Sequence, residues 1–199
     1  MRLKKVKKWW SNLISKINLS KMIELPEIQE LIGQTVKSLY VVVWNPNYCE
    51  PIDVIDITFG FILNEKPTDF LVLTRDINDI WTPELKSVPF PTIVRNWSEF
   101  DAMMSRGDED YYIDYEYFDV SDLKEFSNIV NSEIKEIHKI GVRGIKEPLG
   151  VKIIFENDYI ISLPSSDGNT IETKIFNENN HIRRFQYLGK IKTEIIMKK

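Results

Sequence analysis

The chain has 199 residues and a mass of 23.4 kDa, with 43% hydrophobic residues, 28% charged residues and a formal net charge of -4. This length suits one substantial hydrophobic core, and no run of about 18 apolar residues is present to span a bilayer as a helix. The N-terminus lacks an apolar segment followed by a small-residue cleavage site, so we expect a cytoplasmic protein.

The charge is distributed unevenly along the chain. Residues 1–21 carry seven basic side chains and no acidic one, whereas the remaining 178 residues hold 19 basic and 30 acidic side chains, a balance of -11. Phosphate contacts require clustered lysine and arginine, so this acidic body is a poor nucleic-acid binder. We therefore expect no nucleic-acid partner.

Residues 1–21 also repeat apolar side chains at intervals of three and four, which predicts a basic amphipathic helix. Such a helix fits the acidic body of the protein, the groove of a partner, or an anionic membrane surface, and the pattern does not choose among them. The residues that would make the contact are Lys4, Lys5, Lys8, Trp9 and Trp10. After this helix we expect one domain over residues 22–199.

In the first half of the chain, a proline followed by an acid indicates a short helix over 25–33. Valine, isoleucine and aromatic residues then predict strands over 36–44, 52–63 and 70–74, the last two joined as an antiparallel hairpin. Residues 77–98 contain three prolines and no sustained period, which predicts a long connection that wraps the sheet.

In the second half, helices are expected over 99–104 and after Ser121 or Asp122, where apolar side chains recur at helical spacing. Alternating patterns separated by turn residues predict five further strands, in a meander. These strands are 133–142, 150–155, 159–163, 170–176 and 182–196. The predicted fold class is α+β, a mainly antiparallel twisted sheet of about seven or eight strands with helices packed on one face and the amphipathic helix at the N-terminus.

The most unusual stretch is 108–122, where seven carboxylates alternate with five aromatic rings and no lysine or arginine intervenes. As a strand, it would place Tyr111, Ile113, Tyr115 and Tyr117 on one face, which can pack. The opposite face carries acids that would be costly to bury without partners, so we expect it to meet water or cations. The predicted partner-binding residues on this acidic surface are Asp108, Asp110, Tyr112, Asp114 and Glu116.

Tyrosine is enriched in protein interfaces, and carboxylates attract a basic partner, so this surface suits the docking of a basic protein. A simpler alternative is an edge strand whose charges prevent aggregation and pair with Arg183 and Arg184, and a third is cation binding.

Catalytic and metal signatures are weak. Cys49 is the only cysteine, His138 and His181 are the only histidines, and their spacing matches no zinc site or nucleophile motif. We expect no enzyme activity, no cofactor and no metal, although an unrecognised site around Cys49 stays an alternative. The sequence thus favours a non-catalytic binding module, most concretely an immunity-like binder that neutralises a basic protein, with peripheral membrane attachment as the other alternative.

Overall fold

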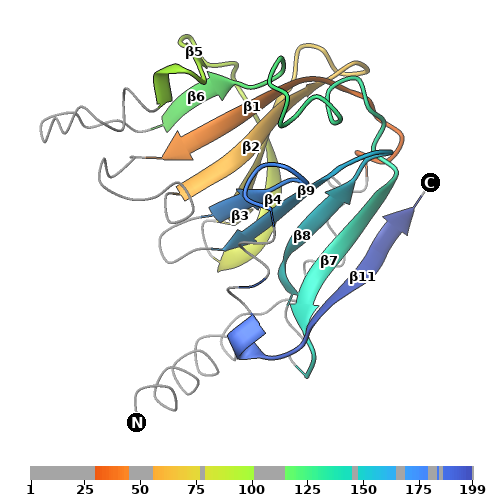
Figure 1. The fold of residues 1–199 in the computed structure, drawn as a ribbon. Coiled ribbons are helices and arrows are strands. Elements are labelled where there is room, and N and C mark those ends of the chain that lie inside the picture. Colours follow the sequence, from red (N-terminus) through yellow and green to blue (C-terminus); the bar gives the residue numbers. More distant parts are fainter. Residues whose placement is uncertain are drawn as a thin grey trace, which may run out of the picture.

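The computed structural model of the chain describes residues 30–44, 56–76, 79–100, 115–144, 148–164, 169–178, 183 and 186–198. Within these residues the chain forms two β-sheets that pack face to face (Figure 1). The predicted helix over 1–21 and most of the predicted helices over 25–33 and 99–104 lie outside the described residues.

The first half of the chain builds a six-stranded sheet in the order β4-β3-β2-β1-β6-β5. All neighbouring strands are antiparallel except β5 and β6, which are parallel. The predicted strands and the hairpin that joins the second and third of them are therefore confirmed within the described residues. The bounds are β1 Val36–Trp44, β2 Asp56–Leu63, β3 Phe70–Asp76, β4 Asp79–Val88, β5 Arg95–Asn96 and β6 Tyr115–Asp119.

The second half builds a five-stranded antiparallel sheet in the order β10-β9-β8-β7-β11. Its first four strands form the predicted meander, and β11 returns to the free side of β7 (Figure 1). The bounds are β7 Glu136–Val142, β8 Pro148–Ile154, β9 Tyr159–Pro164, β10 Asn169–Glu172 and β11 Ile191–Lys198, with a short 3-10 turn, η2, at Gln186–Leu188.

The core lies between the two sheets, because alternate residues of each strand point inward. Phe59 and Phe61 of β2 face the same core as Ile137 of β7, Ile153 of β8 and Ile160 of β9. Each of these side chains is almost fully buried. Burial of side chains of this size contributes about 1.5–3 kcal/mol each, so the sandwich core is the main source of stability.

The predicted α+β class is wrong, because no helix covers either sheet in the described part of the chain and the sheets instead cover each other. The helix expected after Asp122 is a series of tight turns, in which Phe126 donates to Leu123 and Ile129 donates to Phe126. Phe126 and Ile129 are nevertheless buried in the core, as their spacing indicated. Three-residue turns bury the same positions as one helical face, so periodicity alone did not separate the two structures.

The prediction of a connection over 77–98 is also wrong, because residues 79–88 of this segment form strand β4. Pro83 lies inside this strand, opposite Arg75 of β3. Proline lacks the amide proton of a ladder, but β4 is the edge of the six-stranded sheet, where a strand tolerates proline. The last predicted strand is shorter than expected, because η2 and Gly189, at φ 149°, precede β11.

Candidate binding face on the six-stranded sheet

The outer face of the six-stranded sheet, which points away from the five-stranded sheet, carries a second apolar cluster. Tyr40 of β1, Phe70 of β3 and Tyr117 of β6 lie in it, and Phe90, from the segment after β4, packs on its rings. Tyr115 follows on the same face of β6 because strand side chains alternate. We call Tyr40, Phe70, Phe90, Tyr115 and Tyr117 the aromatic face.

The rings of the aromatic face pack edge to face. Tyr40 lies 5.2 Å from Phe70 and 5.6 Å from Phe90, and Phe70 lies 5.4 Å from Phe90, as distances between ring centroids. Tyr117 continues the series at 5.9 Å from Phe70. Such pairs contribute about 0.5–1.5 kcal/mol beyond their buried area, so the rings form a rigid base rather than a loose patch.

Close packing of this base requires a glycine on the neighbouring strand. A Cβ atom added at Gly60 of β2 would lie 2.4 Å from the Cζ atom of Phe70. The Phe70 ring therefore rests directly on the backbone of β2, and only glycine leaves room for it.

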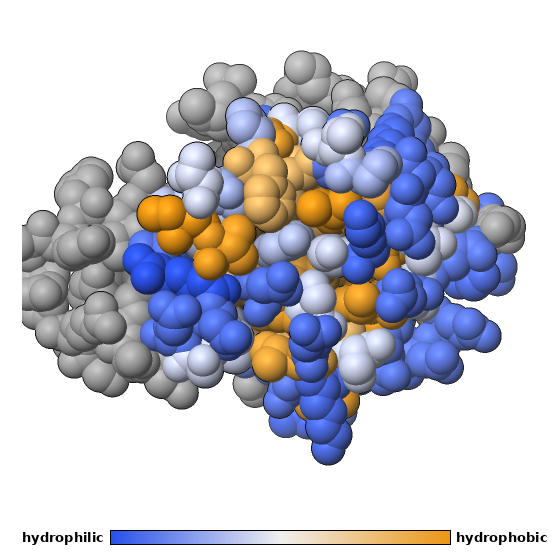
Figure 2. Space-filling view, turned by 90° about the horizontal axis from the view of Figure 1, so that it is seen from above, coloured by the Kyte–Doolittle hydropathy of each residue, from blue (hydrophilic) through white to orange (hydrophobic). Residues whose placement is uncertain are grey.

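The top of the aromatic face is accessible to solvent. Phe90 is 48% exposed, Tyr115 is 52% exposed and Ile93, three residues after Phe90, is 63% exposed, whereas Phe70 beneath them is 1% exposed. Seen from above, the molecule shows hydrophobic residues at its surface in patches bordered by hydrophilic ones (Figure 2). Half-exposed aromatic side chains above a rigid base are the usual anchors of a protein interface.

A carboxylate accompanies the rings. Asp119 of β6 is exposed and lies opposite Tyr40 in the strand register. Burial and the charge of Asp119 raise the pKa of Tyr40, and burial together with Tyr115 raises the pKa of Tyr117. Both phenols keep their protons at neutral pH, and Tyr40, at 6% exposure, belongs to the base of the face rather than to its accessible top.

Glu116, one of the predicted partner-binding residues, points the other way. It is 8% exposed, its Oε2 atom accepts a hydrogen bond of 2.7 Å from Nε of Arg95, and its Oε1 atom accepts one of 3.3 Å from Nη2. This pairing raises the pKa of the Arg95 guanidinium. Glu116 therefore does not face water, as a partner-binding surface would require; the cation that it meets is Arg95 of the same chain, in a partly buried ion pair.

The strand pleat explains this correction. Glu116 shares its face with Phe118 and Val120, both fully buried, whereas Tyr115 and Tyr117 share theirs with exposed Asp119. The apolar residues at the end of β6 decide which face is inside, and the acidic residues at its start do not. Extended structure was predicted here and is confirmed over Tyr115–Asp119.

The other predicted site residues are outside the described residues. They are Asp108, Asp110, Tyr112 and Asp114 of the acidic surface and Lys4, Lys5, Lys8, Trp9 and Trp10 of the N-terminal segment. Sequence reasoning missed Phe90 and Ile93, although Pro89 and Pro91 around Phe90 are a usable signal. Prolines on both sides hold a ring in an extended segment that cannot join a central strand.

The outer face of the five-stranded sheet carries a buried apolar cluster, Ile140, Val142, Ile161 and Leu163, and beside it polar groups that bind one another. The Nζ atom of Lys152 lies 3.9 Å from the ring centroid of Tyr159, whose hydroxyl donates a 3.0 Å hydrogen bond to Glu172. Burial lowers the pKa of Lys152, and burial and Glu172 raise the pKa of Tyr159. These groups hold β8, β9 and β10 together and do not aim at an open cavity.

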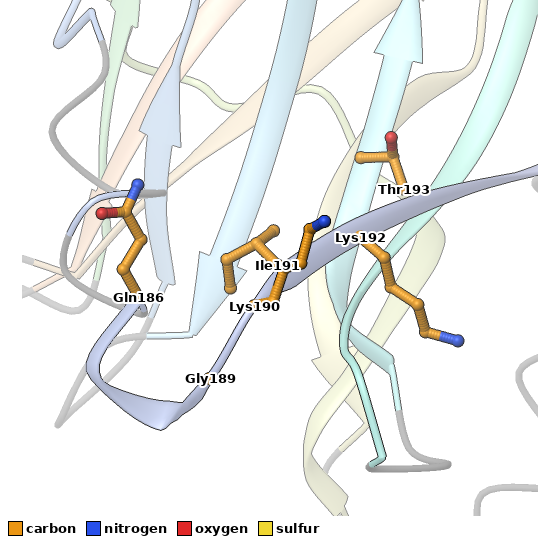
Figure 3. Close-up of a pocket in the computed structure, with 6 residues that line it drawn as sticks. All are labelled: Gln186, Gly189, Lys190, Ile191, Lys192 and Thr193. Atoms are coloured by element: carbon orange, nitrogen blue, oxygen red, sulfur yellow. The ribbon is translucent and has the colours of Figure 1, made fainter.

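A hollow of about 590 Å³ lies beside the start of β11, lined by Gln186, Gly189 and residues 190–193 (Figure 3). A glutamine, two lysines and a threonine supply its polar side-chain atoms, but no buried acid lines it. Within the described ranges, no group of three or more histidine, cysteine, aspartate or glutamate residues could hold a metal ion. Among the same residues, no helix has the length and apolar character that crossing a membrane requires.

His138 places its Nε2 atom 2.7 Å from Oε2 of Glu136, while Cys49 lies outside the described residues. No protein-family model, curated protein or solved structure matches the chain.

Proposed function

We propose that the chain is a cytoplasmic, non-catalytic binding module that holds a basic protein against the aromatic face, most concretely as an immunity-like neutraliser. The observation that carries this proposal is the half exposure of Phe90 and Tyr115 above a base of buried, interlocked rings. A partner that covers these rings removes apolar area from water without ordering new side chains, because the base is already packed.

Charge selects the class of partner. Asp119 adjoins the rings, and the 178 residues after the N-terminal segment have a balance of -11, so a basic protein is attracted and an acidic one repelled. The acids of the 108–114 segment, which directly precedes β6, would add to this field. Charge would speed the encounter, and the rings would supply contact area that salt does not screen.

Site-specific cross-linking tests the proposal. A photoreactive phenylalanine analogue replaces Phe90 in the full-length chain in its native cells, and the same analogue replaces Tyr187 as a control. The two positions have matched exposures of 48% and 49%, but Tyr187 lies on η2, away from the aromatic face. The expected result is an adduct at position 90 with a basic protein, reproduced with that protein in purified form, and little adduct at position 187.

Three outcomes would overturn the proposal: no adduct at position 90, equal adducts at both positions, or an adduct with an acidic protein that resists high salt. Binding of the purified partner should weaken as salt rises from about 50 to about 500 mM, yet persist, because only the electrostatic contribution is screened.

A further inference from the structure

Strand β11 forms an edge of the five-stranded sheet. Among the described residues it pairs with β7 alone, so one side of its backbone has no strand beside it (Figure 1). Most of its side chains are exposed, and Ile195 is 56% exposed although it is apolar. A long strand edge with accessible apolar side chains is a template for pairing with another strand.

The side chains of β11 alternate strictly over Ile191–Ile195. The register with β7 puts Ile191, Thr193 and Ile195 on the outer face of the sheet, with Ile191 packed against the cluster around Ile140 and Val142. Lys192 and Glu194 lie on the opposite face, and Figure 3 shows Lys192 and Thr193 pointing to opposite sides of the strand. A bulge between Ile195 and Met197 ends the regular stretch.

We propose that β11 is a homodimerisation edge, which pairs antiparallel with β11 of a second copy about a two-fold axis through Thr193. In this register Lys192 faces Glu194 of the second copy, and Glu194 faces Lys192. Ile191 faces Ile195 of the second copy, so that the exposed side chain of Ile195 is covered. The regular stretch Ile191–Ile195 is centred on Thr193, so all five of its residues find a partner.

The neighbouring registers are worse. In a continuous sheet, the two residues of a cross-strand pair lie on the same face. The two-fold axis must therefore pass through a residue, and the nearest alternatives to Thr193 are Lys192 and Glu194. An axis at Lys192 sets the two lysines against each other, and an axis at Glu194 does the same with the two glutamates. Like charges directly opposite destabilise a pair of strands by about 0.2–1 kcal/mol for each pair, whereas opposite charges stabilise it.

Lysines on an edge strand are also a common protection against pairing. Here the two functions predict different arrangements: protection requires charges that repel a second copy, while Lys192 and Glu194, which form an ion pair within one chain, would alternate in sign with those of a second copy. Five residue pairs make a small interface, so we expect a dissociation constant on the order of 10 µM.

Charge reversal tests this pairing with exposed residues only. In Lys192→Glu, two glutamates of each copy would face two glutamates of the other, and in Glu194→Lys, lysines would face lysines. Each variant alone should self-associate at least about 10-fold more weakly than the wild type, whereas an equimolar mixture should form a heterodimer of wild-type affinity. Sedimentation velocity of the full-length chain measures the change from the monomer mass of 23.4 kDa to twice that value.

A cysteine pair tests the register separately. With Cys49, the only native cysteine, replaced by serine, Thr193→Cys should form an intermolecular disulfide, because opposite Cα atoms lie about 4.5–5.5 Å apart in an antiparallel pair. Lys192→Cys is the matched control, since the two copies of residue 192 would be about 8 Å apart, too far for a disulfide.

Several results would overturn the proposal. They are a wild type that stays monomeric up to about 500 µM, a mixture of the two charge variants that fails to associate, or Thr193→Cys that cross-links no faster than Lys192→Cys. Circular dichroism confirms that each variant is folded. The aromatic face lies on the other sheet, so dimerisation and binding of a basic protein succeed or fail independently.

Discussion

The two halves of the chain build sheets that share one arrangement of five strands but differ in the chemistry of their outer faces. In each half, four strands form a meander and a later strand, β6 or β11, returns to the free side of the first strand. The inner faces meet in one core. The outer face of the first sheet carries the aromatic face, whereas that of the second carries the buried cluster of Ile140, Val142, Ile161 and Leu163 together with polar groups that bind one another, such as Tyr159 and Glu172.

This difference determines which outer face can gain free energy by binding a partner protein. Polar groups that already satisfy one another gain little when a partner replaces water, because their hydrogen bonds are exchanged rather than added. Apolar rings gain free energy from each square ångström that leaves water. The apolar cluster on the outer face of the second sheet is buried, whereas Phe90 and Tyr115 on the outer face of the first are half exposed, so the first sheet presents rings to a partner and the second offers its edge.

The largest expected effect concerns the base of the aromatic face. Phe70→Ala should lower the free energy of unfolding by about 4 kcal/mol, because it removes a fully buried ring and leaves a cavity above Gly60. Phe90→Ala, at the exposed top, should cost less than about 1.5 kcal/mol. Urea denaturation measures both, and equal losses would show that the outer face has no buried base.

The next effect concerns the buried ion pair of β6. Glu116→Gln should cost about 2 kcal/mol, because it leaves Arg95 without its closest carboxylate in a largely buried position. Glu99→Gln is the control, since Glu99 is half exposed and lies 3.6 Å from Arg95, and it should cost under about 0.5 kcal/mol. If Glu116→Gln is as stable as the wild type, the ion pair between Glu116 and Arg95 does not stabilise the fold, which would contradict this prediction.

A smaller loss of stability is expected when a polar contact on the outer face of the five-stranded sheet is removed. Tyr159→Phe should cost about 1 kcal/mol, because it removes the hydroxyl that donates to Glu172 while keeping the ring beneath Lys152. Tyr187→Phe, at an exposed position, should leave the thermal midpoint unchanged within error. If Tyr159→Phe is equally silent, the polar groups of this face do not hold its strands together.

The smallest effect is a pH dependence at β11. Lys139 and Lys192 lower the pKa of Glu194 from 4.5 to about 2, so the folded state favours its charged form. Its stabilising contribution is complete above pH 4.5 and is lost as the pH falls from 4.5 towards 2. The difference in thermal midpoint between wild type and Glu194→Gln should shrink over that window, measured near 1 µM to avoid self-association. A difference that stays constant with pH would contradict the ion pairs.

Local patterns predicted most strands because each was encoded within its own residues. The strand over 36–44 matches β1, and the alternation of Phe59 and Phe61 correctly predicted the buried face of β2. Turn residues and β-branched side chains act over a few positions, so their signal is readable without knowledge of the fold. The same holds for the buried positions Phe126 and Ile129, although their local structure was wrong.

The errors came from properties that depend on distant residues. Pro83 indicated a loop because the position of β4 at the edge of the sheet cannot be read from the segment itself. The fate of Glu116 depended on Arg95, 21 residues earlier, and on Phe118, whose burial set the inner face of β6. The helices were expected from local capping residues and spacing, whereas the cover of the first sheet comes from a second sheet, which local patterns do not reveal.

The most direct test of the binding face is the affinity of the purified basic partner for two matched variants. Tyr115 and Tyr187 are 52% and 49% exposed, but only Tyr115 lies on the aromatic face. Isothermal titration calorimetry should show about 30-fold weaker binding for Tyr115→Ala and less than about 2-fold weaker binding for Tyr187→Ala. Equal effects of the two substitutions, or a loss confined to Tyr187→Ala, would contradict the account.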